Sequence, residues 1–343
     1  MPSKSVKALL IMASLLAVFP ASAEDFYKGK TITLLVGSGE GGGYDQYARL
    51  LARHMGKYIP GEPAIVVKNQ PAAGGMAMAN ALYTTAPRDG LTIGMMLRDN
   101  PLERLLGNPA AKFAPENFTW LGTSSRYDDD AFCLFVRADT GIMGVSDLQR
   151  PGHATIFGGQ AAGGSETDLV LIARAVFHLN IQFIRGYRSS TDTLLALRRG
   201  EIEGRAITLS TLQKSMGDWL QQGRLRYLMQ FGHTQRWRGL PDVPTARELA
   251  ESPDDKALLE LAEMPFLMSR PFVAPPELPA AQAAILTQAF MRAHQDADYL
   301  REAKDMQLDV SPVAGADMQK LMAHIAQTPP ALVGRYKAAL AAN

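Results

Sequence analysis

The chain has 343 residues, of which 47% are hydrophobic and 20% charged, a composition typical of a globular protein with about two domains. Its formal net charge is +1 and its basic residues form no blocks, which argues against a nucleic-acid partner because phosphate binding needs a basic surface. Cys133 is the single cysteine, so no internal disulfide forms, and its apolar neighbours favour a buried, inert thiol.

Residues 1–23 have the pattern of a secretory signal peptide. Lys4 and Lys7 precede an apolar stretch at 8–19, and small residues at 21–23 suit a cleavage site. The stretch is shorter than the roughly 18 apolar residues of a membrane helix, and its basic flank argues against a buried core helix. We therefore expect export to the periplasm through an N-terminal signal peptide.

Strand and helix patterns alternate along the first two thirds of the chain. Short β-branched runs predict strands at 31–36, 64–67, 92–97, 131–136, 154–157, 182–184 and 226–231. Amphipathic stretches predict helices at 44–58, 76–85, 166–179 and 192–199, followed in the last third by 280–297, 316–327 and 331–342. This alternation predicts the α/β class with mostly parallel sheets, in which ligands bind at loops beyond the carboxyl ends of strands.

The first such loop, residues 37–45, joins a strand to a helix and contains Gly41, Gly42 and Gly43. Glycines allow close approach of a ligand, and a helix start offers unpaired N–H groups, so we expect an anion site there. The spacing fits neither a dinucleotide fingerprint nor a Walker loop, which argues against nucleotide binding. A merely flexible turn is the alternative.

Three further loops, at 69–75, 158–165 and 186–192, also follow predicted strands and lead into helices. A serine at such a helix start either caps the helix or offers its hydroxyl to a ligand, and both options stay open for Ser165. Helix N-termini from two lobes could together clamp the two ends of a dicarboxylate. The candidate ligand-binding residues of these three loops are Ala72, Gly74, Gly163, Gly164, Ser165, Tyr187, Ser189 and Ser190.

The sequence resembles the substrate-binding components of tripartite tricarboxylate transporters, the TctC or Bug family of periplasmic proteins. The resemblance is carried by Gly41-Gly42-Gly43-Tyr44-Asp45, Asn69-Gln70-Pro71-Ala72-Ala73-Gly74-Gly75, Ala86-Pro87-Arg88-Asp89-Gly90, Gly163-Gly164-Ser165, Gly186-Tyr187-Arg188-Ser189-Ser190, Leu240-Pro241-Asp242-Val243-Pro244-Thr245 and Val273-Ala274-Pro275-Pro276. It implies a two-lobed Venus-flytrap fold in which these loops hold a ligand carboxylate, partly through ordered water. The chain departs from the family pattern at 37–40, at Tyr44 and at 158–162, which leaves the ligand's identity open.

Outside these loops, Arg98 is a candidate because it follows a strand and a guanidinium fork suits a carboxylate. A solvated arginine is the equal alternative, and Arg126 and Arg205 are weaker candidates. Asp45 is placed in the site, where we expect it to orient its loop rather than touch an anion, since like charges repel. The acidic run at 128–130 lacks the spacing of a calcium loop and the six histidines lack metal-ligand spacing, so we expect neither metal nor cofactor.

We expect lobe one to comprise residues 24–123 plus 240–343, and lobe two residues 124–239. The function predicted is a monomeric solute-binding protein that delivers a small carboxylate to membrane transporter subunits. An enzyme is disfavoured because no Gly-x-Ser-x-Gly nucleophile elbow occurs. A ligand-binding module that signals to a membrane sensor remains open, since lobe closure serves either partner.

Overall fold

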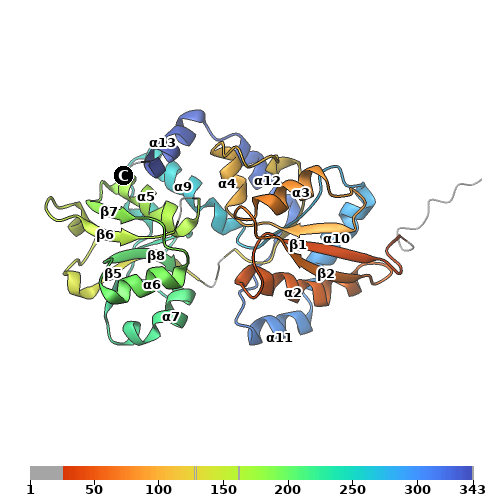
Figure 1. The fold of residues 1–343 in the computed structure, drawn as a ribbon, viewed down its shortest axis with the longest axis horizontal. Coiled ribbons are helices and arrows are strands. Elements are labelled where there is room, and N and C mark those ends of the chain that lie inside the picture. Colours follow the sequence, from red (N-terminus) through yellow and green to blue (C-terminus); the bar gives the residue numbers. More distant parts are fainter. Residues whose placement is uncertain (1–25, 127, 129, 161–162, 342–343) are drawn as a thin grey trace, which may run out of the picture.

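The computed structural model describes residues 26–126, 128, 130–160 and 163–341, arranged as two lobes side by side (Figure 1). The predicted signal peptide at 1–23 lies outside these residues. Within them, none of the helices combines the length and apolar character needed to cross a bilayer.

The first lobe is built on a six-stranded sheet with the strand order β11-β4-β10-β3-β1-β2. Strand β1 runs parallel to β2 and β3, whereas β10 runs antiparallel to β3 and β4. The strands are β1 (Thr31–Val36), β2 (Ala64–Asn69), β3 (Thr92–Met95), β4 (Thr119–Thr123), β10 (Pro271–Ala274) and β11 (Val313–Ala314).

The second lobe is built on a five-stranded sheet with the order β7-β6-β8-β5-β9. Strand β6 runs parallel to β7 and β8, and β5 runs antiparallel to β8 and β9. The strands are β5 (Phe132–Arg137), β6 (Thr155–Gly158), β7 (Ile181–Ile184), β8 (Gly204–Thr208) and β9 (Leu225–Phe231).

Helices cover both sheets, and polar or acidic residues from the preceding loops stabilise the helix N-termini. The acidic Asp45 in the first turn of α2 suits the positive end of the helix dipole, and the Ser189 hydroxyl caps α6 by accepting from the Asp192 N–H. The helices are α2 (Gly43–Met55), α3 (Met76–Thr84), α4 (Asn100–Leu105), α5 (Ser165–Phe177), α6 (Ser190–Arg199), α7 (Leu209–Gln221), α8 (Ala246–Leu249), α9 (Pro253–Leu267), α10 (Ala280–Ala293), α11 (Ala297–Asp305), α12 (Gly315–Ala326) and α13 (Pro330–Ala341).

The expected α/β class is confirmed, but the expectation of mostly parallel sheets is wrong. Both sheets are mixed, because β10 and β11 in the first sheet and β5 in the second run antiparallel to their neighbours. The β-branched pattern predicted neither β8, which contains Gly204 and Arg205, nor β10, which begins at a proline. The lobe boundaries stay a prediction, and α9 and α13 pack against α5 of the second sheet although both follow residue 240.

The buried apolar residues show how the two lobes are joined. One continuous cluster runs from α3, α4 and α12, on the side of the first sheet, to α5, α9 and α13, on the side of the second sheet. On the opposite side, α2 and α10 cover one separate core and α6 and α7 cover another (Figure 1). The lobes are therefore packed together along the α4–α13 side and separated along the α2–α7 side.

Candidate functional site

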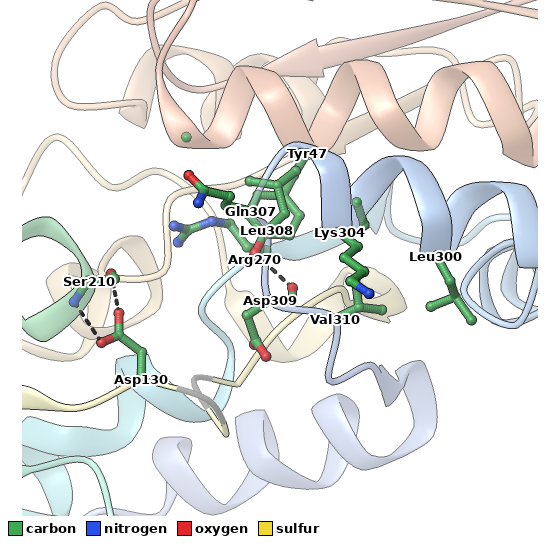
Figure 2. A pocket seen from close by; sticks show the side chains of 12 residues that line it. Tyr47, Asp130, Ser210, Arg270, Leu300, Lys304, Gln307, Leu308, Asp309 and Val310 are labelled. Atoms are coloured by element: carbon green, nitrogen blue, oxygen red, sulfur yellow. Dashed lines mark hydrogen bonds between the residues drawn. The ribbon is translucent and has the colours of Figure 1, made fainter. Parts of the chain in front are cut away.

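A cavity of about 490 Å³ lies between the lobes on the α2–α7 side. Such a volume falls within the range that holds small-molecule ligands. Its position follows from the strand directions: Arg270 immediately precedes the antiparallel β10, so it lies at the same edge as the carboxyl ends of β1 and β3. The lining residues are Gly43, Tyr47, Asp130, Ser210, Arg270, Leu300, Ala303, Lys304, Gln307, Leu308, Asp309 and Val310 (Figure 2).

Arg270 is the central cation of the first lobe's wall. Its guanidinium carbon lies 4.7 Å from the Tyr44 ring centroid and 5.0 Å from that of Tyr47, and Nη1 donates to the Ser269 carbonyl at 2.7 Å. A Cβ added to Gly43 would lie 3.5 Å from Nη2, so the guanidinium sits beside the start of α2. This places a held arginine and a helix N-terminus at one end of the cavity, a combination that suits an anion.

The first predicted loop is held by Asp45. Its buried carboxylate accepts hydrogen bonds from the Gly41 N–H at 2.8 Å, from Arg49 Nε at 2.8 Å and from Asn69 Nδ2 at 2.9 Å. Burial alone would raise the pKa of Asp45, but these hydrogen bonds lower it below the ordinary value. Asp45 therefore orients the loop, Gly42 precedes α2 as its N-cap, and Gly43 borders the cavity.

Arg98 and Tyr44 meet behind Arg270. The Arg98 main-chain N–H donates to the Tyr44 hydroxyl at 3.2 Å, and burial raises the pKa of Tyr44 although the charges of Arg98 and Arg270 oppose this. The Arg98 side chain is only 11% exposed, stacks on Phe266 at 4.9 Å and has its Nε 3.8 Å from Asp99 Oδ2. It is not the solvated arginine that the sequence left open.

The second predicted loop lies outside the cavity lining. Ala72 and Gly74 are exposed, and the Gly74 carbonyl accepts a hydrogen bond from Asn100 Nδ2 at 3.1 Å. The structure thus ties this loop to α4 of its own lobe.

The third predicted loop contacts the first lobe directly. Gly164 is the N-cap of α5, and Ser165, which makes no capping hydrogen bond, donates through Oγ to Asp99 Oδ1 at 2.9 Å. A side chain at Gly163 would collide with the Glu103 carboxylate of α4. Burial raises the pKa of Asp99, against the opposing effects of Arg98 and of the Ser165 hydrogen bond. Ser165 therefore does not cap α5 but makes an interlobe contact, and its contact with a ligand stays a prediction.

The fourth predicted loop lies at the start of α6. Ser189 caps this helix through a 3.1 Å hydrogen bond from the Asp192 N–H, and Tyr187 packs against an apolar cluster that includes Ile202. Ser190 Oγ donates to Glu166 Oε1. Ser165 and Ser190 are thus each bonded to a carboxylate, Asp99 and Glu166 respectively.

Several polar residues of the site were not predicted from the sequence. Arg270 was not predicted because no strand was expected directly after it. Glu166 was not predicted because an acidic residue in the first turn of a helix is common without any ligand. Arg205, a weak candidate before, pairs with Glu166 at 2.6 Å. Among the described residues, no three histidine, cysteine, aspartate or glutamate side chains are grouped to hold a metal ion.

Residues 47–335 match the sequence profile of the "Tripartite tricarboxylate transporter family receptor", TctC. A Cupriavidus necator protein described as "UPF0065 protein in gbd 5'region" is 29% identical over 243 residues, which are 68% of this chain and 69% of the relative.

Two solved structures share the fold at low sequence identity. A TctC solute binding protein from Polaromonas superposes with a TM-score of 0.67 at 18% identity, over 92% of this chain and 99% of that chain. MatC from Rhodopseudomonas palustris, with bound malate, gives a TM-score of 0.60 at 18% identity, over 91% and 99% of the two chains. With its two lobes and interlobe cavity, the chain belongs to the tripartite tricarboxylate transporter receptor family, the TctC solute-binding proteins.

Proposed function

We propose that this protein captures a small carboxylate-containing metabolite between its lobes in the periplasm and delivers it to the membrane subunits of a tripartite tricarboxylate-type transporter. The observation that carries the proposal is Arg270, stacked on two tyrosines at the wall of a cavity of about 490 Å³ between the lobes. Membership of the TctC family supports the binding role.

In this proposal the ligand carboxylate lies against the Arg270 guanidinium and the N–H groups at the start of α2. Two tyrosine rings hold the guanidinium plane, so little side-chain freedom remains to be lost when a ligand binds. Ser210 and Asp130 belong to the facing wall, where the Asp130 carboxylate accepts from the Ser210 N–H at 3.0 Å. The lobes would then close around the ligand by a hinge movement.

The remaining site residues of the proposal are those expected from the sequence, Arg98 and the residues of the four loops: Gly41, Gly42, Gly43, Tyr44, Asp45, Ala72, Gly74, Gly163, Gly164, Ser165, Tyr187, Ser189 and Ser190. Gly43 and Tyr44 have the strongest support, because both lie beside Arg270. The malate bound to MatC, a structural relative, supports a carboxylate as the ligand class. Export through residues 1–23 and action as a monomer complete the proposal.

A thermal-shift screen tests the binding role. The chain from Glu24 onward would be unfolded and refolded to remove carried-over ligand, then heated with a panel of monocarboxylates, dicarboxylates, tricarboxylates, amino acids and aromatic acids. A ligand at about 100 times its dissociation constant stabilises the folded state by about 2.7 kcal/mol, which raises the Tm by several degrees. Stabilisation by carboxylates but not by the matching amides or alcohols is expected, and equal stabilisation by both would contradict the proposal.

Delivery to a transporter needs a second measurement. Deleting the gene should abolish uptake of the identified ligand. If uptake persists while a ligand-dependent transcriptional response is lost, the chain signals to a membrane sensor instead.

A further inference from the structure

The second lobe holds a carboxylate of its own at the start of α6. Glu166 lies in the first turn of α5, and its side chain is 21% exposed. Its Oε1 accepts a hydrogen bond from Ser190 Oγ, while Oε2 accepts from Gln160 Nε2 at 3.2 Å and from Arg205 Nη2 at 2.6 Å. A guanidinium, a hydroxyl and a side-chain amide therefore converge on one carboxylate.

Arg205 is fixed in the lobe and needs an anionic partner. It is 0% exposed on β8, and its Nη1 donates to the Ser190 carbonyl at 2.8 Å. Its Nε is buried and has no hydrogen-bond partner among the described residues. Because burying a lone charge is costly, a carboxylate must lie beside this guanidinium, and Glu166 supplies it.

The donor set around Glu166 is of the kind that binds a ligand carboxylate. Ser190 is the first residue of α6, so the partial positive charge of a ten-residue helix adds to the charge of Arg205. The lobe thus contains an anion site, and a side chain of the protein occupies it.

Glu166 also faces the first lobe. Its charge is one of the influences that raise the pKa of Asp99, and the adjacent Ser165 donates to Asp99 across the lobes. The charges of both Arg270 and Glu166 act on the pKa of Asp99, so Asp99 lies near both residues. A ligand that extends from Arg270 beyond the cavity lining toward α5 would therefore approach the carboxylates of Asp99 and Glu166. A second negative charge on the ligand is repelled there, whereas a hydrogen-bond donor is attracted.

We propose that Glu166 determines ligand specificity by filling the second lobe's anion site, so that the protein accepts monocarboxylates with a hydrogen-bond donor at the far end and rejects dicarboxylates. This inference rests on the proposed function, because it assigns the two ends of a ligand bound between the lobes. The sequence suggested that two helix N-termini bind both carboxylates of a dicarboxylate. In the present proposal, Arg270 binds one carboxylate, and Glu166 accepts a hydrogen bond from the other end of the ligand.

Ligand pairs of equal length test the specificity. Titration calorimetry would compare 4-hydroxybutyrate and 4-aminobutyrate with succinate, and 6-hydroxyhexanoate and 6-aminohexanoate with adipate. The wild type is expected to bind the monocarboxylates of at least one length more than tenfold more tightly than the dicarboxylate. Glu166→Ala, which vacates the anion site, is expected to shift this ratio toward the dicarboxylate by tenfold or more. Glu166→Gln removes the charge but still fills the site, so its shift should be smaller.

Chemical rescue tests the filled anion site without any natural ligand. Glu166→Ala is expected to lower the Tm, and millimolar formate or acetate should restore it in a saturable way that equal ionic strengths of chloride do not. Glu248→Ala is the matched control, because Glu248 pairs with Arg236 at the same 2.6 Å separation but is 45% exposed. Its Tm should show no specific response to formate.

The outcomes separate the inference from the proposed function. A wild type that binds dicarboxylates as tightly as monocarboxylates, with the ratio unchanged in Glu166→Ala, overturns the inference and leaves carboxylate binding intact. A wild type that binds neither the monocarboxylates nor the dicarboxylates overturns the proposed function as applied to these ligands. Rescue of Glu166→Ala by formate would still show whether Glu166 fills an anion site. If Glu166→Ala does not fold, the isosteric Glu166→Gln is measured in its place. An affinity ratio that does not shift toward the dicarboxylate in Glu166→Gln would then overturn the inference.

Discussion

The two walls of the cleft use arginine in opposite ways. In the first lobe Arg270 lies at the cavity surface, held by the faces of Tyr44 and Tyr47. In the second lobe Arg205 is 0% exposed and is paired with Glu166. Helix starts of both lobes lie at the space between them, yet Arg270 borders the cavity whereas Arg205 is buried and pairs with Glu166. From this difference we infer the orientation of the ligand, with its carboxylate at Arg270 and a hydrogen-bond donor toward Glu166.

The largest effect is expected from removing the charge of the first wall. Arg270→Gln keeps much of the side chain's volume but loses the guanidinium, and hydrogen bonds to charged groups contribute about 1.5–3 kcal/mol. Carboxylate affinity should therefore fall about ten- to hundredfold, and the Tm of the ligand-free protein should fall slightly because the stacking on Tyr44 and Tyr47 is lost. Titration calorimetry with the best ligand of the thermal-shift screen measures the loss.

Arg104→Gln serves as the control for this substitution. Arg104 is an exposed arginine of the same lobe, on α4, and borders a different cavity near α12. Its affinity should match the wild type. Equal losses in both variants would mean that net charge attracts the ligand and that Arg270 has no specific role.

The contrast between the walls also explains how far the sequence could predict this site. The glycine-rich loop at 37–45 and the serines at 165, 189 and 190 could be proposed as site residues because strand-to-helix junctions have a local pattern. The partners of Ser165 and Ser190 were not predicted, because Asp99 and Glu166 meet them only through the fold. Arg270 was missed for the same reason: its place at the cavity depends on the antiparallel direction of β10, which no local pattern encodes.

The charge at the start of α5 should depend on pH through the buried Asp168, two residues beyond Glu166. Burial raises the pKa of Asp168 to about 7, although its carboxylate accepts a 2.9 Å hydrogen bond from the Gly163 N–H. Between about pH 4 and pH 7 the folded state keeps this proton and the unfolded state loses it. Asp168 should therefore make the free energy of unfolding fall as the pH rises, by at most about 1.4 kcal/mol per pH unit.

Urea unfolding at several pH values, for the wild type and Asp168→Asn, measures this contribution as a difference between two curves. The variant cannot ionise at this position, so its unfolding free energy lacks this pH dependence. As the pH rises toward 7, the stability of the variant should therefore increase relative to that of the wild type. A difference independent of pH would show that Asp168 is ionised in the folded protein. The start of α5 would then carry the negative charge of Asp168 in addition to that of Glu166.

The smallest effect is expected at the point where the two walls touch. Ser165→Ala removes the 2.9 Å hydrogen bond to Asp99 but leaves the N-cap residue Gly164 unchanged. Losing one partner of a buried polar pair costs about 1–3 kcal/mol, and access of water to an opened cleft keeps the value near the lower limit. Hydrogen exchange should therefore become several-fold faster at the starts of both α4 and α5, which belong to different lobes.

Ser189→Ala is the matched control, because Ser189 caps α6 within the second lobe alone. Faster exchange in that variant should be confined to α6. If Ser165→Ala accelerates exchange only in α5, the hydrogen bond to Asp99 does not couple the lobes, and the apolar cluster shared by α4, α5, α9 and α13 holds them together by itself. If exchange also becomes faster in α4, the hydrogen bond between Ser165 and Asp99 helps to hold the lobes together. A ligand that moves Asp99 toward Arg270 would then weaken this hydrogen bond as it binds.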